Sequence, residues 1–212
     1  MIVCPLCGSS APLRRLSTLS ACYFECPECR VLTLDPSLRL SREDEKSRYL
    51  HHENSPSDPG YTAHLRKALD PLLVLLAPGM RGLDFGCGPV PTVSVLLGEL
   101  GFHVENYDPL FRPDEALLND SYDFITCTEV VEHFFNPSNE YQRLDRALKP
   151  GGVLVVMTKV YDGTFAFEGW DYLRDPTHVS LYQPQTFEWI AQAHGWELSV
   201  PSPTVRILRK SA

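Results

Sequence analysis

Residues 83–90 read LDFGCGPV, and this stretch decides the fold that we expect for the chain. Asp84 stands near the end of a short apolar run, and Gly86 and Gly88 follow it around a single cysteine. Glycines between a strand and a helix let a ligand approach the backbone closely. Pro91 replaces the third glycine of the dinucleotide pattern GxGxxG, and GK[ST] is absent, so the stretch matches neither a pyrophosphate loop nor a P-loop.

The sequence after Arg81 alternates between short apolar runs and helical patterns. The apolar runs are GLDF, HVENYD, YDFITC and VLVVMT, and the helical segments are TVSVLLGELG and EYQRLDRALKPGG. This alternation predicts an α/β fold with a doubly wound parallel sheet, whose ligand lies at the carboxyl ends of the strands. The glycine loop follows the first run and therefore belongs to that edge.

Two acids favour a ligand that carries a ribose and an amine but no phosphate. Asp108 ends the second apolar run, twenty residues beyond Gly88, where an acid is placed for the two hydroxyls of a ribose. Asp84 would repel a phosphate but could help to hold an ammonium group, directly or through water. S-adenosylmethionine is a ligand of this kind.

The motifs LDFGCGP, NYDP, YDFITCTEVVEHF and LKPGG together resemble those of class I S-adenosylmethionine-dependent methyltransferases. EVVEH and DPTHVSLY are similar to the branch that includes ubiquinone-pathway O-methyltransferases, and the resemblance covers roughly residues 81–196. It implies a Rossmann-like seven-stranded sheet that ends in an antiparallel hairpin formed by WELSVPSPTVRILRK. Many family members have glycine where this chain has Val90, between two prolines.

The resemblance also implies a cofactor site at the carboxyl edge of the sheet. In it, Gly86 and Gly88 approach the methionine end of S-adenosylmethionine, and Asp108 holds the ribose. The residues expected to border this cofactor are Tyr61, Asp84, Gly86, Cys87, Gly88, Asp108, Pro109, Cys127, Thr128 and Glu129.

Four of the seven cysteines form two CxxC pairs near the start of the chain. Cys4, Cys7, Cys26 and Cys29 follow the pattern C-x2-C-x18-C-x2-C. Two such knuckles can coordinate one zinc ion tetrahedrally. A segment this short has almost no core of its own, so metal binding would supply its folding free energy. We expect a structural zinc ribbon; a closed site of four cysteines has no open position for catalysis. The alternative is four buried or redox-active cysteines, with Cys22 in place of Cys26.

The expected organisation has three parts. These are a zinc ribbon over residues 1–34, a linker and lid segment over 35–60, and a methyltransferase domain over 61–212. In the linker, SREDEKSRYLHH predicts a helix capped by Ser41, with acids in its first turn. Asp58 and Pro59 predict the start of a second helix, which ends at Pro78-Gly79.

Candidates for the chemistry lie after two strands. Glu129, Glu132 and His133 would share one face of EVVEH if it were helical, and His178 lies in TFAFEGWDYLRDPTHVSLY, which we expect to cap the pocket. Both histidines follow strands at the cofactor edge, so we expect them to converge beside the methyl group, with Val179 in the core. Three interpretations stay open: these two glutamates and two histidines bind a divalent cation, as the resemblance suggests; His133 is a general base; or the residues are purely structural.

Composition favours a soluble cytoplasmic protein. The net charge is −8, so nucleic acid is not a favoured partner, and LLVLLA is too short to span a bilayer. MIVCPLCG has no basic n-region, so we expect no signal peptide. We expect an enzyme that methylates a small molecule with a hydroxyl. The alternatives are an RNA or protein methyltransferase that uses the ribbon as its reader, and a non-catalytic binding module.

Overall fold

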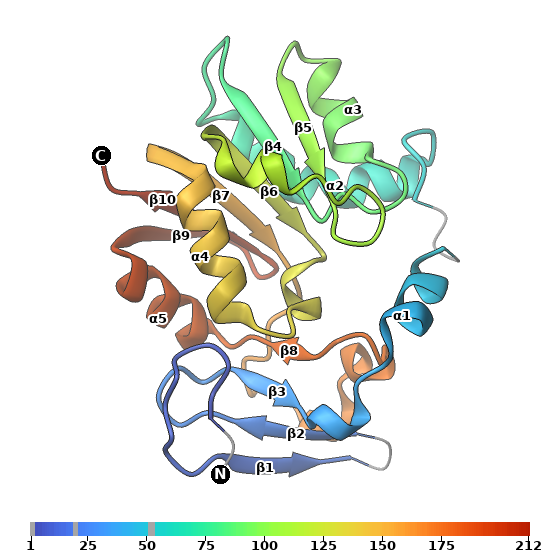
Figure 1. Ribbon diagram of the computed structural model, residues 1–212, viewed down its shortest axis with the longest axis vertical. Helices are drawn as coiled ribbons and strands as arrows, with labels where there is room; N and C mark the ends of the chain where they lie inside the picture. Colours follow the sequence, from blue (N-terminus) through green and yellow to red (C-terminus); the bar gives the residue numbers. More distant parts are fainter. Residues whose placement is uncertain (1–2, 19–20, 51–53) are drawn as a thin grey trace.

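A computed structural model describes residues 3–18, 21–50 and 54–212 and shows two β-sheets (Figure 1). The larger sheet has the spatial order β5 (His103–Tyr107), β4 (Arg81–Phe85), β6 (Tyr122–Thr128), β7 (Leu148–Met157), β10 (Val205–Lys210), β9 (Trp196–Ser202). The first four strands in this order are parallel, and β10 is antiparallel to both of its neighbours. The Rossmann-like α/β fold and its closing hairpin are thus confirmed.

The strand count differs from the seven that the family resemblance implied. The described residues form six strands in the larger sheet. Residues 108–121 join β5 to β6 and fold as a turn followed by the 3-10 helix η2 (Glu115–Asn119). A crossover to a further parallel strand needs about a dozen residues besides the strand itself, so this connection is too short to hold one. β5 is therefore an edge strand.

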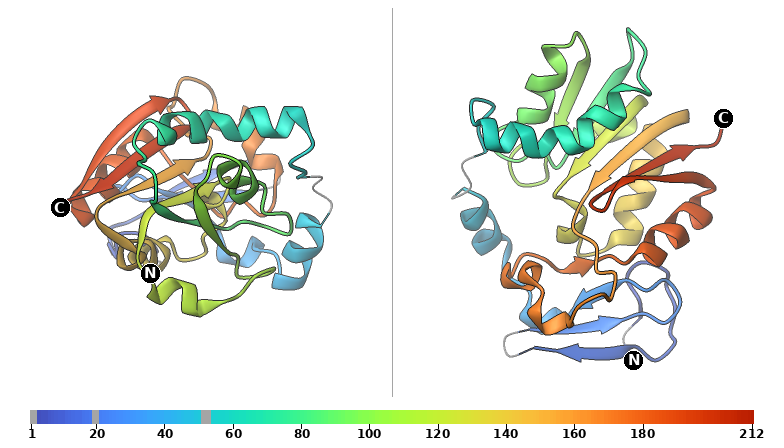
Figure 2. Two further views of the ribbon diagram at one scale, coloured as in Figure 1. Left: turned by 90° about the horizontal axis from the view of Figure 1, so that it is seen from above. Right: turned by 180° about the vertical axis from the view of Figure 1, so that it is seen from behind.

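Helices cover both faces of the larger sheet (Figures 1 and 2). α2 (Pro59–Leu73) and α3 (Thr92–Gly98) lie on one face, and α4 (Pro137–Ala147) and α5 (Pro184–His194) lie on the other. Neighbouring side chains of β6 point to opposite faces, so Phe124 packs with α2 while Ile125 packs with α4. Burial on both faces explains why the central strands read as continuous apolar runs.

The starts of the first two helices agree with the caps predicted from the sequence. Ser41 caps α1 (Arg42–Tyr49), and Asp58 caps α2, each by accepting a backbone N–H with a side-chain oxygen. α2 ends at Leu73, earlier than the Pro-Gly pair expected to stop it. Pro71 lies within its last turn and cannot donate the backbone hydrogen bond to residue 67, which weakens the helix near this end.

The smaller sheet joins the N-terminal segment to a distant part of the chain. It comprises β1 (Arg14–Ser17), β2 (Cys22–Glu25), β3 (Leu32–Leu34) and β8 (Ser180–Leu181), all antiparallel to their neighbours. β8 comes from the segment between β7 and α5, and Figure 1 shows it beside β3 at the bottom of the larger sheet. The remaining 3-10 helices are η1 (Pro36–Leu38), η3 (Val131–His133), η4 (Phe167–Gly169) and η5 (Asp171–Arg174).

The N-terminal ribbon is packed onto the rest of the chain rather than standing apart. Cys4, Cys26 and Cys29 belong to the same apolar core as Ile125 of β6 and Leu144 of α4. The smaller sheet and this apolar core therefore both extend across residue 34, where the boundary between ribbon and linker was expected. In the described part of the chain, no helix combines the length and the apolar character needed to cross a bilayer.

Candidate functional site

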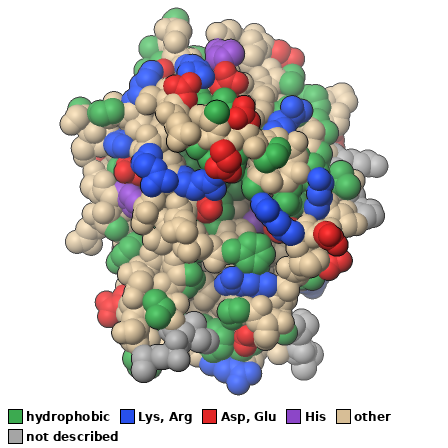
Figure 3. All heavy atoms as spheres, in the orientation of Figure 1, with side chains coloured by type: hydrophobic (Ala, Val, Ile, Leu, Met, Phe, Trp, Pro, Cys, Tyr) green, Lys and Arg blue, Asp and Glu red, His purple; other side chains and the backbone are tan. Residues whose placement is uncertain are grey.

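A cavity of about 660 Å³ lies at the carboxyl edge of the larger sheet. Its lining comes from the residues that follow β4, β5 and β6, together with parts of α1, α2 and η5. Figure 3 shows this face hollowed near its middle, with basic, acidic and apolar side chains around the hollow. The volume lies in the range of small-molecule sites, and the position is the one predicted from the strand–helix alternation.

The glycine loop forms one wall of the cavity and depends on the absence of side chains. Gly86 and Gly88 have φ angles of 81° and 66°, in the left-handed region that favours glycine. A Cβ at Gly86 would lie 2.5 Å from the methyl carbons of Val130, whereas one at Gly88 would have no neighbour within 4 Å. Gly86 therefore packs against Val130 with no room for a side chain, while a side chain at Gly88 would project into open space.

Asp108 is anchored at the end of β5 by three backbone amides. Its Oδ2 accepts from the N–H of Gly88 at 2.9 Å, and its Oδ1 accepts from Leu110 and Phe111 at 2.8 and 3.0 Å. The carboxylate thus links the glycine loop to the turn after β5. A carboxylate has about four lone-pair positions, so it retains acceptor capacity toward the cavity that it lines.

Asp84 is a buried acid, and no basic side chain of the described residues forms an ion pair with it. Burial raises its pKa to about 7, and the nearby charge of Asp108 adds to this, although the Thr126 hydroxyl donates a 2.8 Å hydrogen bond that opposes the shift. Asp84 also lines the cavity. A cationic ligand beside it would supply the missing partner and favour the ionised form.

The EVVEH segment is not an α-helix. Glu129 has a φ of 54°, and only Val131–His133 form a turn of 3-10 helix. Glu132, His133 and His178 nevertheless each offer a ligand atom within 4.8 Å of the others. The rings of the two histidines are 5.1 Å apart, so they lie together as expected, while their place beside a methyl group stays a prediction. Val179, 1 % exposed, lies in the core as predicted.

Both histidines have their Nδ1 atoms engaged by backbone carbonyls. His133 Nδ1 is 2.9 Å from the oxygen of Thr177, and His178 Nδ1 is 2.7 Å from the oxygen of Tyr172. A carbonyl can only accept, so each Nδ1 carries a proton, and each neutral ring keeps its lone pair on Nε2. Burial and the other histidine lower the pKa of His133 to about 4, and burial lowers that of His178.

Glu132 is buried and carries an unpartnered oxygen. Tyr172 Oη donates to its Oε1 and also lies 3.3 Å from Glu129 Oε2, whereas Glu132 Oε2 has no hydrogen-bond partner among the described residues. Burial, with the charge of Glu129, raises the pKa of Glu132 well above its usual range. An orphaned carboxylate oxygen beside two imidazole lone pairs is a donor set that fits a divalent cation.

Nine of the ten residues expected to border the cofactor line the cavity. They are Tyr61, Asp84, Gly86, Cys87, Gly88, Asp108, Pro109, Thr128 and Glu129. Cys127 does not belong to this lining, and that part of the prediction was wrong. Its side chain is fully buried in the core under α4, because alternate residues of β6 face opposite sides of the sheet.

Sequence reasoning missed several residues that reach the site from the helices before the sheet, among them His64 and Tyr49. His64 of α2 places Nε2 3.2 Å from Glu129 Oε1, and the Tyr49 ring of α1 lies edge-on to His133 at 5.3 Å. His64 stands one helical turn after Tyr61, a spacing that could have indicated a shared face. Tyr49 had no such signal, because α1 reaches the site only through the tertiary fold.

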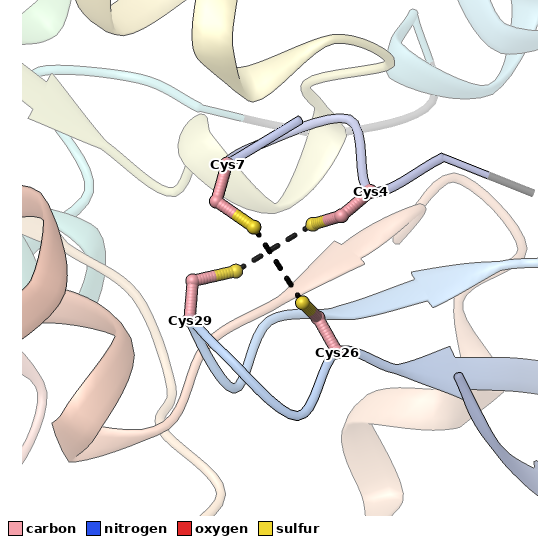
Figure 4. Close-up of side chains that lie close together, drawn as sticks. All are labelled: Cys4, Cys7, Cys26 and Cys29. Atoms are coloured by element: carbon pink, nitrogen blue, oxygen red, sulfur yellow. Dashed lines mark hydrogen bonds between the residues drawn. The ribbon is translucent and has the colours of Figure 1, made fainter. Parts of the chain in front are cut away.

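The four CxxC cysteines point toward a common centre (Figure 4). Cys4 Sγ is 3.5 Å from Cys29 Sγ, and Cys7 Sγ is 3.6 Å from Cys26 Sγ. Four sulfurs at the usual 2.3 Å from a tetrahedral zinc would be about 3.8 Å apart, so the cluster fits that ion. Cys22 lies outside it and accepts a hydrogen bond from Arg15, which does not support the alternative that Cys22 replaces Cys26.

Comparison with known proteins places the chain in a family. A family model described as a methyltransferase domain matches residues 61–199, and the chain belongs to that family. The ubiquinone biosynthesis O-methyltransferase of Colwellia psychrerythraea is 30 % identical over 87 residues, which are 41 % of this chain and 35 % of the relative. That of Klebsiella pneumoniae is 26 % identical over 120 residues, 55 % of this chain and 50 % of the relative. The chain thus spans half or less of these relatives.

A solved structure supports the fold over nearly the whole chain. The 1,6-didemethyltoxoflavin-N1-methyltransferase of Burkholderia thailandensis matches 95 % of this chain and 100 % of its own with a TM-score of 0.53. The sequence identity is 15 %, so this likeness concerns the fold alone. Together with the family match, it confirms the class I methyltransferase fold that the motifs indicated.

The buried Asp84 carboxyl should leave a signature in the pH dependence of stability. Its pKa is higher in the folded state than in the unfolded chain, so the folded state retains a proton and loses stability as pH rises from about 4 to about 7. In Asp84→Asn this loss should be absent. The free energy of unfolding of the variant should therefore rise by up to about 4 kcal/mol relative to that of the wild type across that interval. Urea unfolding at several pH values measures it.

The matched control is Asp70→Asn, because the Asp70 side chain on α2 is exposed. It should keep the pH profile of the wild type. An unchanged profile in Asp84→Asn would contradict the assignment of a neutral buried carboxyl at that position.

Proposed function

We propose that this protein transfers a methyl group from S-adenosylmethionine to a hydroxyl of a small molecule. The observation that carries the proposal is one cavity lined by two chemically distinct groups of residues. One group comprises the open glycine loop, the anchored Asp108 and Asp84, which has no ion-pair partner among the described residues. The other comprises Glu132 with the two histidines. The first group would hold the cofactor, and the second would face the acceptor.

The charges of the cavity favour a cationic cofactor. The acidic side chains of the lining are Glu45, Asp84, Asp108, Glu115, Glu129, Glu132, Glu140 and Asp175, whereas the basic ones are Arg42 and Arg143. The acids of the lining outnumber its basic side chains even without Asp84 and Glu132, whose pKa values are raised. S-adenosylmethionine carries a sulfonium and an ammonium besides one carboxylate, so such a field attracts it. The same field opposes a polyanion, which argues against nucleic acid as the acceptor.

The reaction needs positioning more than acid–base chemistry. A lone pair of the acceptor oxygen attacks the methyl carbon, and the carbon–sulfur bond breaks with its electrons going to sulfur. The product thioether leaves as S-adenosylhomocysteine, and the acceptor loses its proton. The walls of the cavity would hold both reactants in line.

We propose that Glu132, His133 and His178 hold a divalent cation, with Glu129 beside them. The support is geometric: Glu132, His133 and His178 each offer a ligand atom within 4.8 Å of the others, and Glu132 Oε2 has no hydrogen-bond partner among the described residues. When bound, such an ion would lower the pKa of the acceptor hydroxyl and orient it. In the remaining alternative, His133 takes the proton without a metal.

The acceptor is proposed to be a small molecule. The names of the similar proteins, a ubiquinone biosynthesis O-methyltransferase and a didemethyltoxoflavin methyltransferase, refer to small acceptors. α1 adds Arg42, Glu45 and Tyr49 to the cavity lining, so this helix partly encloses the cavity. We also propose that the enzyme is cytoplasmic.

Cofactor binding is the first test. The purified protein should bind S-adenosylmethionine and S-adenosylhomocysteine in calorimetry. Asp108→Ala should weaken both by about 10- to 100-fold, because charge-assisted hydrogen bonds contribute about 1.5–3 kcal/mol. Asp114→Ala is the control, since Asp114 caps η2 in the same connection without lining the cavity. Binding of NAD in place of S-adenosylmethionine would overturn the proposal, and binding without transfer to any acceptor in a substrate library would favour a non-catalytic module.

The second cation is tested by chelation. Methyl transfer to an acceptor found in such a library should fall with EDTA and return with Mg²⁺, Mn²⁺ or Zn²⁺. His178→Ala should reduce turnover by at least about 100-fold while S-adenosylhomocysteine affinity stays within about twofold. Activity that ignores the chelator and follows one ionisation would instead support His133 as a general base.

We further propose that the four-cysteine cluster holds one structural zinc. Metal analysis should find about one zinc per chain, with four sulfur ligands in X-ray absorption spectra. Cys26→Ser should lose the zinc and lower the free energy of unfolding of the whole chain by more than about 3 kcal/mol, because the cluster shares its core with β6 and α4. Cys22→Ser should keep the zinc. A zinc-free native protein would refute the proposal.

A further inference from the structure

The segment that carries His178 continues directly into the sheet of the N-terminal ribbon. β8 begins two residues after His178 and pairs with β3, with Thr33 opposite Ser180. The N–H of Leu34 also donates to the carbonyl of Val179 at 2.8 Å. The backbone next to this histidine is thus held by ribbon residues rather than by the larger sheet.

One side chain of the ribbon reaches His178 itself. Tyr23 of β2 is 1 % exposed, and its hydroxyl donates a 2.8 Å hydrogen bond to the His178 carbonyl. The Tyr23 ring packs edge-on against Phe167 at 5.7 Å, which limits the positions that the hydroxyl can adopt. A buried hydrogen bond to a carbonyl fixes the backbone from which the imidazole projects.

The other side of the same segment holds the glutamate and histidine of η3. The N–H of Val179 donates to the carbonyl of Glu132 at 2.8 Å, and Ser180 Oγ donates to the carbonyl of Phe134 at 2.7 Å. Residues 178–180 are therefore clamped between the ribbon on one side and the EVVEH segment on the other. A shift of the ribbon would move both histidines and Glu132 relative to the larger sheet.

The second cysteine knuckle is tied to this segment as well. Gln183 Nε2 donates to Glu25 Oε1 at 2.7 Å and to the carbonyl of Arg30 at 2.8 Å. Glu25 directly precedes Cys26, and Arg30 directly follows Cys29. The strand that leaves His178 consequently ends in hydrogen bonds to both flanks of the cysteine knuckle.

We propose that the N-terminal ribbon serves as an internal support that positions His178, with Tyr23 as the positioning residue. The inference rests on the proposed function, because the role of His178 belongs to it. It assigns the ribbon a task inside the enzyme and replaces the idea of a reader for RNA or protein. In keeping with this, β8 of the same chain, rather than an external strand, occupies the β3 edge of the ribbon.

The test compares two tyrosine-to-phenylalanine variants of the full chain. Tyr23→Phe removes the hydroxyl that binds the His178 carbonyl and keeps the ring. Tyr122→Phe is the control, since its hydroxyl donates at 3.0 Å to the carbonyl of Leu117, away from the cavity. Both variants lose one tyrosine–carbonyl hydrogen bond, so a general loss of stability should be similar in the two.

The main readout is nitrogen-15 NMR of the imidazole rings, which needs no substrate. Tyr23→Phe should shift or broaden the His178 and His133 signals and leave those of His103 and His194 unchanged, whereas Tyr122→Phe should move none of them. With an acceptor in hand, Tyr23→Phe should lower kcat about tenfold and change the Kd of S-adenosylhomocysteine by less than about twofold.

Each result decides between positioning and plain stabilisation. If Tyr23→Phe lowers the unfolding midpoint as Tyr122→Phe does, but leaves the His178 signals and kcat unchanged, the positioning role is refuted. If the wild type fails to bind S-adenosylmethionine or to transfer methyl groups, the proposed function fails instead. The NMR comparison would still report whether the ribbon holds His178.

Discussion

The site depends on one topological constraint: parallel strands joined by helices all end at the same edge of their sheet. β4, β5 and β6 are parallel neighbours, so the residues after them, Gly86, Asp108 and Glu129, meet there although they are far apart in sequence. The hydrogen bond from Thr126 to Asp84 and the one from the Gly88 amide to Asp108 then fix the three strand ends relative to one another. The position of the cavity thus follows from the strand order and does not depend on the chemistry of individual side chains.

The interior of the cavity departs from the usual rules of protein packing. Three features each cost stability: the Asp84 carboxyl and Glu132 Oε2, which are buried without a basic partner and without a hydrogen-bond partner, respectively, among the described residues, and the left-handed backbone at Glu129. The surrounding core is apolar on both faces of the sheet and can sustain these costs. Such departures collect where ligands bind, because a ligand supplies the missing partners.

Much of the fold could be predicted from the sequence, because strands and caps are encoded locally. The four apolar runs became β4 to β7, Ser41 and Asp58 cap their helices, and Asp84 and Asp108 line one cavity. The failures concern long-range geometry. The direction of Cys127, the turn at Glu129 and the approach of His64 depend on the packing of distant elements, and the two-residue strand β8 is too short to show any periodicity.

The pairing of β3 with β8 has a consequence for the order of events during synthesis. The cysteine knuckles are translated long before Leu181, but the sheet beside them cannot be completed until Leu181 has been made. The early segment must therefore wait with an exposed strand edge and an unfilled apolar surface while most of the chain is translated. Closing so long a loop is entropically slow, so the ribbon is completed much later than its own residues are made.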